Sequence, residues 1–277
     1  MTRTAQDLSL GEVLDLERIE DDLFRSTATF HDPEGVYGGQ VLAQALRAAS
    51  LTVPEGFIAH SLHGYFVRPG DPTVPIVFTV HRDRDGRSYA ARRAVAVQGG
   101  EVLLNLSASF QVPEESPDVQ GPTLPAVAMP RDLSRHRVLT RAVGVEFLDA
   151  EPDSELPTPA CVWARITDDA IAEDPNLSAS MITYVSDMCS GVFKLVDFDW
   201  NVTLTSIDHA LWLYRPTKPK WLLLDLRGES VSNGRAFYRG HIFDQDGVLV
   251  AGLAQESLYR KRDRPRPVTI KRVLEEQ

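Results

Sequence analysis

The chain contains an internal repeat whose two copies lie about 147 residues apart. Residues 61–69 (SLHGYFVRP) return as residues 208–216 (DHALWLYRP), and in both copies a Gly-Arg turn and then a second Gly-led turn follow in the same order. A repeat of this length is a duplicated domain, because the units of solenoid proteins run about 20 to 50 residues. With 277 residues, the chain is long enough for two units that each bury a core of their own.

Each copy is predicted to hold one buried helix followed by four strands. In the first copy, residues 40–50 follow Gly38-Gly39 and are apolar on most sides, which is typical of a helix inside a fold. The polar side chains Gln40, Gln44 and Arg47 fall on one narrow stripe of this helix, so we expect the stripe to face a polar cavity or another helix. In the second copy we expect the helix at residues 178–195, after a capping turn at Asp174-Pro175-Asn176.

The strand signals are short apolar runs separated by Gly, Pro and Asp turns. They lie at residues 60–67, 76–81, 89–97 and 102–112 in the first copy, and at 143–148, 161–166, 202–214, 221–230, 235–243 and 248–259 in the second. Short turns without intervening helices indicate antiparallel pairing. The fold class is therefore predicted to be α+β, with an antiparallel sheet wrapped around one long helix in each of two tandem units.

The division of the chain follows from a change in composition between the copies. Residues 113–141 contain five prolines among acidic and small residues, and we expect such a segment to be a linker without a core. The predicted units are residues 1–112 and residues 142–277, and the second unit ends in a basic tail.

Composition excludes several classes of function. Hydrophobic residues make up 43% and charged residues 25% of the chain, as in soluble globular proteins. No run of 18 apolar residues and no apolar signal core is present, and there are only two cysteines, so we expect a cytoplasmic protein without a membrane span. The net charge of -10 argues against a nucleic-acid partner, which requires clustered Lys and Arg.

Asp187 is the first candidate for chemistry. It lies beside the apolar stripe of the second predicted helix, where a buried carboxylate costs several kcal/mol unless partners offset its desolvation. A solvated or capping Asp187 is the alternative. Shifted back by about 147 residues, Asp187 falls on Gln40, so a group that can accept a proton replaces an amide.

Two further residues distinguish the copies in the same way. The shift places Ser206 on Ala59, and Gln255 on Ala108 or Ser109. The second copy thus holds an acid, a hydroxyl and an amide for which the first has no matching set. We infer one reactive site per chain, built largely by the second copy.

Together these motifs resemble those of the type II acyl-CoA thioesterases, the double hotdog thioesterases of bacteria and peroxisomes. The resemblance extends from about residue 14 to residue 259. Its motifs are residues 36–41 (VYGGQV), 60–71 (HSLHGYFVRPGD), 108–111 (ASFQ), 186–187 (SD), 206–212 (SIDHALW) and 246–256 (DGVLVAGLAQE).

The resemblance implies a hotdog fold in each half and hydrolysis of acyl-CoA to a free fatty acid and coenzyme A. It also implies catalytic roles for Asp187, Ser206 and Gln255. Many relatives have Thr at the position of Ser206. Serine keeps the hydroxyl but lacks the methyl group that restricts the rotamer of threonine. Chemically, such a set can orient and deprotonate a water, while helix N-terminal amides stabilise the oxyanion. A dimer or tetramer is a further expectation from the resemblance.

Other combinations of catalytic or metal-binding residues have less support in the sequence. The chain has no G-x-S-x-G elbow and no zinc-binding spacing of Cys and His, so we expect no serine nucleophile, metal or other cofactor. Cys161 and Cys189 are predicted to be core residues. His209 follows Asp208, but neighbours on a strand point to opposite faces, and we expect His209 to be structural.

Three other functions remain open on the sequence: a hotdog enoyl-CoA hydratase, which needs an Asp/His pair facing one cavity, a non-catalytic acyl-CoA binding protein, and an interaction module in which Asp187 closes a salt bridge. The residues that hold coenzyme A are unassigned. The candidates are Arg68, Arg87, Arg92 and the basic tail from Arg260 onward.

Overall fold

The computed structural model describes residues 8–29, 35–133, 136–137, 143–151, 160–167, 174–196, 202–217 and 221–261. The first part of the chain contains α1 (Leu10–Leu14), β1 (Leu16–Glu20), β2 (Leu23–Ser26), α2 (Gly38–Ser50), β3 (Ile58–Phe66), β4 (Val77–Asp85), β5 (Tyr89–Gln98) and β6 (Glu101–Gln111). The 3₁₀ helix η2 (Pro130–Asp132) and β7 (His136–Arg137) follow. The remaining elements are β8 (Val145–Asp149), β9 (Cys161–Ile166), α3 (Pro175–Ser186), η4 (Gly191–Lys194), β10 (Val202–Ser206), β11 (Asp208–Leu213), β12 (Leu222–Ser232), β13 (Arg235–Asp244) and β14 (Leu249–Lys261).

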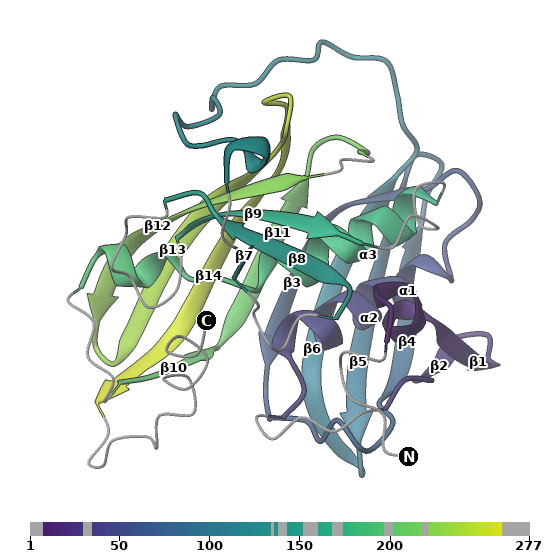
Figure 1. Ribbon diagram of the computed structural model, residues 1–277. Helices are drawn as coiled ribbons and strands as arrows, with labels where there is room; N and C mark the ends of the chain where they lie inside the picture. Colours follow the sequence, from purple (N-terminus) through teal and green to yellow (C-terminus); the bar gives the residue numbers. More distant parts are fainter. Residues whose placement is uncertain are drawn as a thin grey trace.

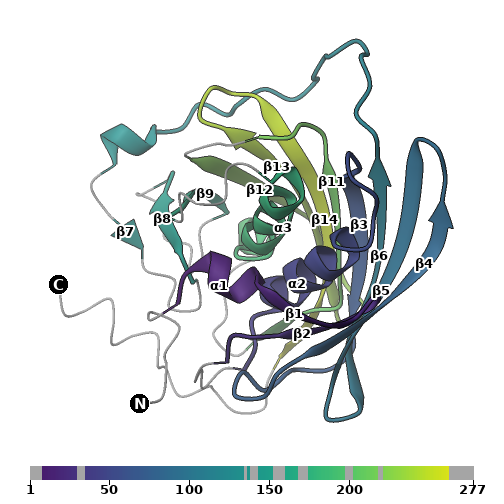
Figure 2. The same ribbon diagram turned by 90° about the vertical axis from the view of Figure 1, so that its right-hand side faces the viewer.

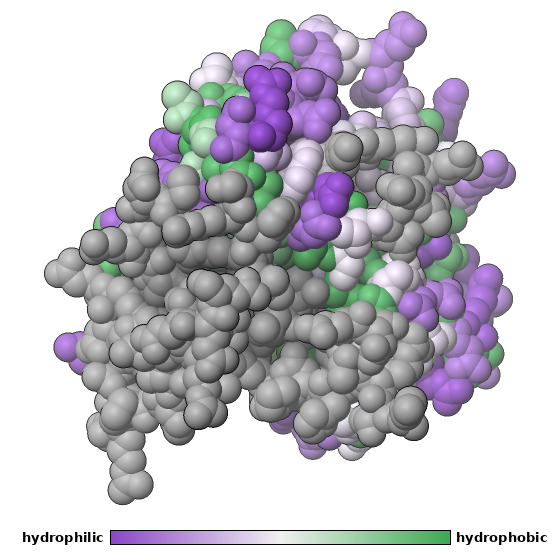
Figure 3. Space-filling view, in the orientation of Figure 1, coloured by the Kyte–Doolittle hydropathy of each residue, from purple (hydrophilic) through white to green (hydrophobic). Residues whose placement is uncertain are grey.

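The described strands form one antiparallel sheet in the order β1-β2-β4-β5-β6-β3-β11-β14-β13-β12-β9-β8-β7, with β10 also paired to β14. The sheet curves around α2 and α3, which lie side by side inside it (Figures 1 and 2). Outside, hydrophilic side chains cover the right-hand edge in Figure 3, over β1, β2 and β4. Charged residues on the exposed edge strand β1 discourage further strand pairing there.

The predicted repeat appears in the strand register. Strands β3 and β11 join the two halves, and His63 pairs directly with Ala210, which lies 147 residues further on. Tyr37 and Tyr184 are also 147 residues apart; their rings meet edge to face at 5.0 Å, and the Tyr37 hydroxyl donates to the Tyr184 carbonyl. Residues that correspond by sequence thus face each other across the junction.

The register also fixes which strand residues correspond. Ala59 pairs with Phe110, and Ser206 pairs with Ser257, so each partner is displaced by 147 residues. The correspondence of Ser206 with Ala59 is therefore confirmed at the level of strand pairing.

Helix α2 agrees with the prediction from sequence, since it begins at Gly38, ends at Ser50 and is almost wholly buried. Its polar stripe faces other helices: the Gln44 side chain donates to the carbonyl of Val13 in α1, and Arg47 pairs with Asp174 at the start of α3. The predicted capping turn is also confirmed, because the Asp174 side chain accepts from the Asn176 amide, with Pro175 at the first helical position.

The predicted extent of the second helix is wrong. α3 ends at Ser186 rather than at residue 195, and Asp187 is its C-cap. In a longer helix the Thr183 carbonyl would accept the Asp187 N–H. Instead the Ser186 hydroxyl oxygen lies 2.8 Å from that carbonyl oxygen, and the Asp187 amide bonds to the Val185 carbonyl.

The long strand predicted at residues 202–214 is also interrupted. It forms β10 and β11, with a break at Ile207 where the chain passes between β14 and β3. The pairing with β14 slips by one residue between Ser206 and Ala210. Such an irregularity re-aims the side chains beside it.

The segment predicted to be a linker without a core does pack in its described part. Leu124, Val127, Met129 and Leu133 lie against a small apolar cluster formed by β8, β9, β12, β13 and β14. The Trp163 indole also donates to the Ala128 carbonyl. The described part of this segment is thus held against the second half, because a few apolar side chains suffice to bind an existing apolar cluster.

After α3, the chain passes very close to β12. A Cβ added to Gly191 would lie 2.7 Å from the Arg227 nitrogen and 2.9 Å from the Gly228 nitrogen. Neither backbone atom can move without disturbing the sheet, so glycine is required here for close approach.

We therefore expect Gly191→Ala to destabilise the protein by about 1–3 kcal/mol through overpacking. Urea unfolding followed by circular dichroism measures this loss. Gly121→Ala is the matched control, because a Cβ at Gly121 meets no atom within 4 Å. Equal stability of the two variants would contradict the packing described.

Candidate functional site

The break in the chain after α3 brings Asp187 against the N-terminus of α2. A Cβ added to Gly38 would lie 2.8 Å from the Asp187 Oδ2 atom, and the Gly39 backbone amide also interacts with the carboxylate. The first amides of a helix have no acceptor within it and carry partial positive charge. A helix of the first half thus supplies positive potential to an acid of the second half.

Gln255 on β14 joins the other two predicted residues to this acid. Its Nε2 atom donates to Asp187 Oδ1 at 2.9 Å and to Ser206 Oγ at 2.6 Å. Gln255 is 3% exposed and the Asp187 side chain is 4% exposed. The structure therefore brings the three sequence-predicted residues into one hydrogen-bonded group, in which the Asp187 and Gln255 side chains are buried and Ser206 is half-buried.

Burial determines the electrostatics of this group. Desolvation raises the pKa of Asp187 above its ordinary value, while His209, Gln255, Gly39 and Ser206 oppose that rise by stabilising the charged form. A carboxylate of raised pKa is a better base than an exposed one.

Two buried tyrosines border the acid. Burial, and secondarily the charge of Asp187, raises the pKa of both Tyr37 and Tyr238 well above the ordinary value. Their hydroxyls donate to the carbonyls of Tyr184 and Cys189. These tyrosines consequently stay neutral walls of the site.

His209, which the sequence patterns did not single out for this site, contacts the same group of residues. The ring is 0% exposed, its Nδ1 atom contacts Gln255 Oε1, and its Nε2 atom lies 2.9 Å from Ser186 Oγ. The rejected Asp208–His209 pair is indeed absent, because Asp208 bonds to His63 and to the Glu256 amide instead. The sequence held no clear signal for this role, because it depends on the break at Ile207, which the strand pattern does not reveal.

The break explains how Ser206 and His209 meet the same partner. In a regular strand, residues an odd number apart point to opposite faces. The slip at Ile207 removes one step of this alternation, so both side chains reach Gln255.

Asp187 and Gln40 correspond in sequence position, but they occupy different places in their helices. Gln40 lies in the first turn of α2, whereas Asp187 ends α3. Gln40 is buried, and its Oε1 atom has no hydrogen-bond partner among the described residues.

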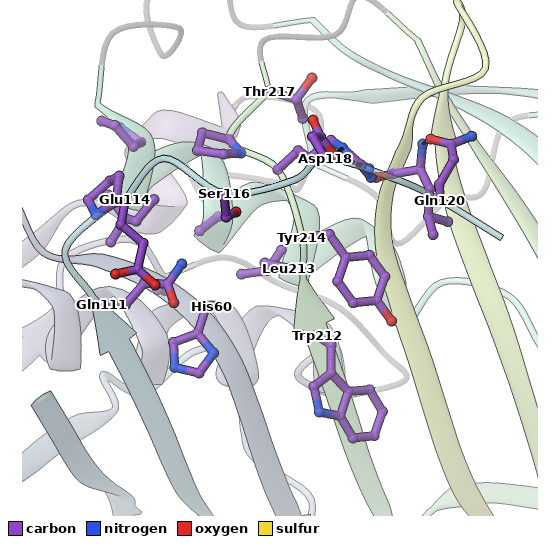
Figure 4. Close-up of a pocket in the computed structure, with 18 of the residues that line it drawn as sticks. His60, Gln111, Glu114, Ser116, Asp118, Gln120, Trp212, Leu213, Tyr214 and Thr217 are labelled. Atoms are coloured by element: carbon purple, nitrogen blue, oxygen red, sulfur yellow. Dashed lines mark hydrogen bonds and ion pairs between the residues drawn. The ribbon is translucent and has the colours of Figure 1, made fainter. Parts of the chain in front are cut away.

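A separate cavity of about 980 Å³ lies beneath residues 113–121 (Figure 4). Its wall includes Ala59, the counterpart of Ser206, but not Asp187. The acidic residues Glu114, Glu115 and Asp118 border it, which is unfavourable for the phosphates of coenzyme A. None of the three predicted residues Asp187, Ser206 and Gln255 lines this cavity.

The arginines suggested for coenzyme A have different surroundings. Arg92 is fully buried and bonds to Asp85 and Thr52, so it is structural rather than a ligand contact. Arg68 is half exposed and pairs with Glu101, and Arg87 is exposed. Most of the basic tail lies outside the described residues.

Cys161 and Cys189 are buried, as predicted. Burial raises the pKa of the Cys161 thiol to about 12, which disfavours the nucleophilic thiolate. Among the described residues, no cluster of three His, Cys, Asp or Glu side chains could hold a metal ion. No helix in the described ranges is long and apolar enough to cross a membrane.

Solved structures share the architecture. An acyl-CoA thioesterase II from Mycobacterium marinum superposes with a TM-score of 0.78 and 35% identity, covering 92% of this chain and 99% of the other. A hotdog protein from Alicyclobacillus acidocaldarius, 22% identical, superposes with a TM-score of 0.70 and coverage of 90% and 97%. The second likeness shows the hotdog fold alone.

Sequence comparisons agree over the same range. Acyl-CoA thioesterase 2 of Haemophilus influenzae is 31% identical over 91% of this chain and 97% of its own length. Human acyl-coenzyme A thioesterase 8 is 29% identical over 90% and 88%. Family models of the acyl-CoA thioesterase N-terminal and C-terminal domains match residues 27–111 and 113–259. The chain therefore belongs to the acyl-CoA thioesterase family.

Proposed function

We propose that this chain hydrolyses acyl-CoA thioesters to a free acid and coenzyme A, with Asp187, Ser206 and Gln255 as the catalytic residues. The observation that carries the proposal is the single Gln255 amide that bridges the buried Asp187 carboxylate and the Ser206 hydroxyl. The family membership supplies the substrate class.

In this mechanism Asp187 is the general base. It accepts a proton from a water held with the help of Ser206 and Gln255, and the water oxygen attacks the thioester carbonyl carbon. The N-terminus of α2 stabilises the oxyanion that forms, because helix N-terminal amides attract negative charge. When the oxyanion collapses, the carbon–sulfur bond breaks and the thiolate leaves without strong acid assistance, since thiol pKa values are roughly 8.5.

The architecture we propose around this site is a double hotdog, with units at residues 1–112 and 142–277 joined by residues 113–141. The mirrored strand orders of the two halves and the adjacent matches to N-terminal and C-terminal family domains support it. Only one turnover site results, because Ala59 and Ala108 replace the hydroxyl and the amide in the first half.

The hydratase alternative needs an Asp/His pair that faces one cavity. Asp187 and His209 approach within 3.8 Å. However, both ring nitrogens of His209 already contact protein groups, and the ring is fully buried. This arrangement favours a supporting rather than a proton-transferring histidine.

The first test is thioester hydrolysis followed by release of free thiol. We expect the wild type to hydrolyse acyl-CoA and Asp187→Asn to lose about 10²- to 10⁴-fold in kcat, the range typical for loss of a general base. Ser206→Ala and Gln255→Glu should also lose activity. Asp21→Asn is the control, because the side chain of Asp21 is 89% exposed.

The same assay separates the alternatives. Full activity of Asp187→Asn would refute the mechanism. Hydration of an enoyl-CoA without thiol release would identify a hydratase, and binding of acyl-CoA without turnover would identify a binding protein. Acyl-CoAs of increasing chain length would define the preferred substrate.

A second prediction concerns pH. Because the pKa of Asp187 is raised, kcat/KM should fall as the pH decreases through that raised value and the base becomes protonated. The folded state binds this proton more tightly than the unfolded state does, so ionised Asp187 lowers stability above its folded pKa.

Asp187→Asn should consequently unfold at an equal or higher temperature than the wild type at pH 8. The advantage should shrink as the pH falls toward 4, where the wild-type carboxyl is protonated in the folded state. Differential scanning calorimetry across this range measures it. A clear loss of stability in the Asn variant at pH 8 would contradict the assigned burial penalty.

A third prediction tests the asymmetry of the halves. Gln40→Asp introduced into Asp187→Asn should not restore hydrolysis, because Ala59 and Ala108 provide neither hydroxyl nor amide. Thiol release from the double variant measures this. Recovery of activity would show that the first half still holds a competent site.

A further inference from the structure

His209 makes contacts that determine which way the Gln255 amide points. A glutamine amide has one accepting oxygen and one donating nitrogen. The nitrogen faces Asp187 and Ser206, and the oxygen faces His209 Nδ1. In the reverse orientation the amide oxygen would face the ionised Asp187 carboxylate, placing two acceptors against each other.

The protons of His209 follow from its other neighbour. Ser186 Oγ lies 2.8 Å from the Thr183 carbonyl oxygen and 2.9 Å from His209 Nε2, and it has a single proton to donate. If the hydroxyl donates to Nε2, the neutral imidazole carries its proton on Nδ1. If the hydroxyl donates to Thr183, Nε2 must carry a proton, and Nδ1 still needs its own because the Gln255 oxygen that it contacts can only accept. Nδ1 carries a proton in both arrangements.

From this geometry we propose that His209 is a positioning residue, whose Nδ1–H holds the Gln255 oxygen and so keeps the Gln255 nitrogen directed at Asp187 and Ser206. The proposal rests on the proposed function only for its effect on turnover. His209 touches neither substrate nor water in this scheme, and it acts through Gln255.

Two substitutions of His209 distinguish the hydrogen-bond donor at Nδ1 from the volume of the ring. The amide nitrogen of asparagine falls near the position of imidazole Nδ1, whereas that of glutamine falls near Nε2. His209→Asn therefore keeps a donor toward Gln255, while His209→Gln keeps only the contact with Ser186. We expect His209→Gln to lose about 10- to 100-fold in kcat with little change in KM, as for a misaligned catalytic group, and His209→Asn to keep at least about ten times the kcat of His209→Gln.

The background of Gln255→Glu provides a further control. If His209 acts through the Gln255 amide, His209→Gln should cause no additional loss of kcat in that background, because the two substitutions remove the same interaction. Equal kcat for His209→Asn and His209→Gln, or additive losses with Gln255→Glu, would overturn the proposal.

A second measurement does not depend on activity. ¹⁵N NMR of the imidazole rings in the wild type, with the His209 signals assigned by their loss in His209→Asn, reports whether Nδ1 is protonated. A bare Nδ1 would overturn the proposal. Absence of thioester hydrolysis by the wild type would refute the proposed function but leave this reading intact, whereas an active wild type with a bare Nδ1 would refute only the role of His209.

Discussion

The burial of one carboxylate, that of Asp187, is the constraint around which the site is arranged. A buried ion needs donors that replace water. Gln255 provides one from β14, and the N-terminus of α2 provides the Gly39 amide. These donors come from both halves, so the buried carboxylate is stabilised from either side of the junction. The cost that remains appears as a raised pKa of Asp187, which strengthens the carboxylate for the role of base in the proposed mechanism.

Duplication explains why the acid lies at this junction. Residues related by 147 positions meet across it, as Tyr37 and Tyr184 do, and as His63 and Ala210 do in the sheet. Such a junction offers two equivalent places for a site. In one of them the polar groups of Ser206 and Gln255 are present, and in the other Ala59 lines a separate cavity.

Much of this arrangement could be predicted from the sequence. Apolar runs and turn residues located the strands, and an all-round apolar pattern located α2. The comparison of copies selected Asp187, Ser206 and Gln255, which the fold places in contact. The end of α3 at Ser186 could not be predicted, because apolar periodicity continues to residue 195. The contact of the Ser186 hydroxyl with the Thr183 carbonyl, which takes the place of a helical hydrogen bond, depends on three-dimensional geometry. The break at Ile207, which brings His209 to Gln255, could not be predicted from the strand pattern either. Nor could the burial of Arg92, which depends on Thr52, a partner 40 residues away.

The ionisation of Asp187 itself tests the account most directly. ¹³C NMR of protein labelled at the aspartate carboxyl carbon, with the Asp187 signal assigned by its loss in Asp187→Asn, follows this group through pH. The account predicts a pKa above the ordinary aspartate value that coincides with the acid limb of kcat/KM. A carboxyl that titrates at or below the ordinary value would contradict it.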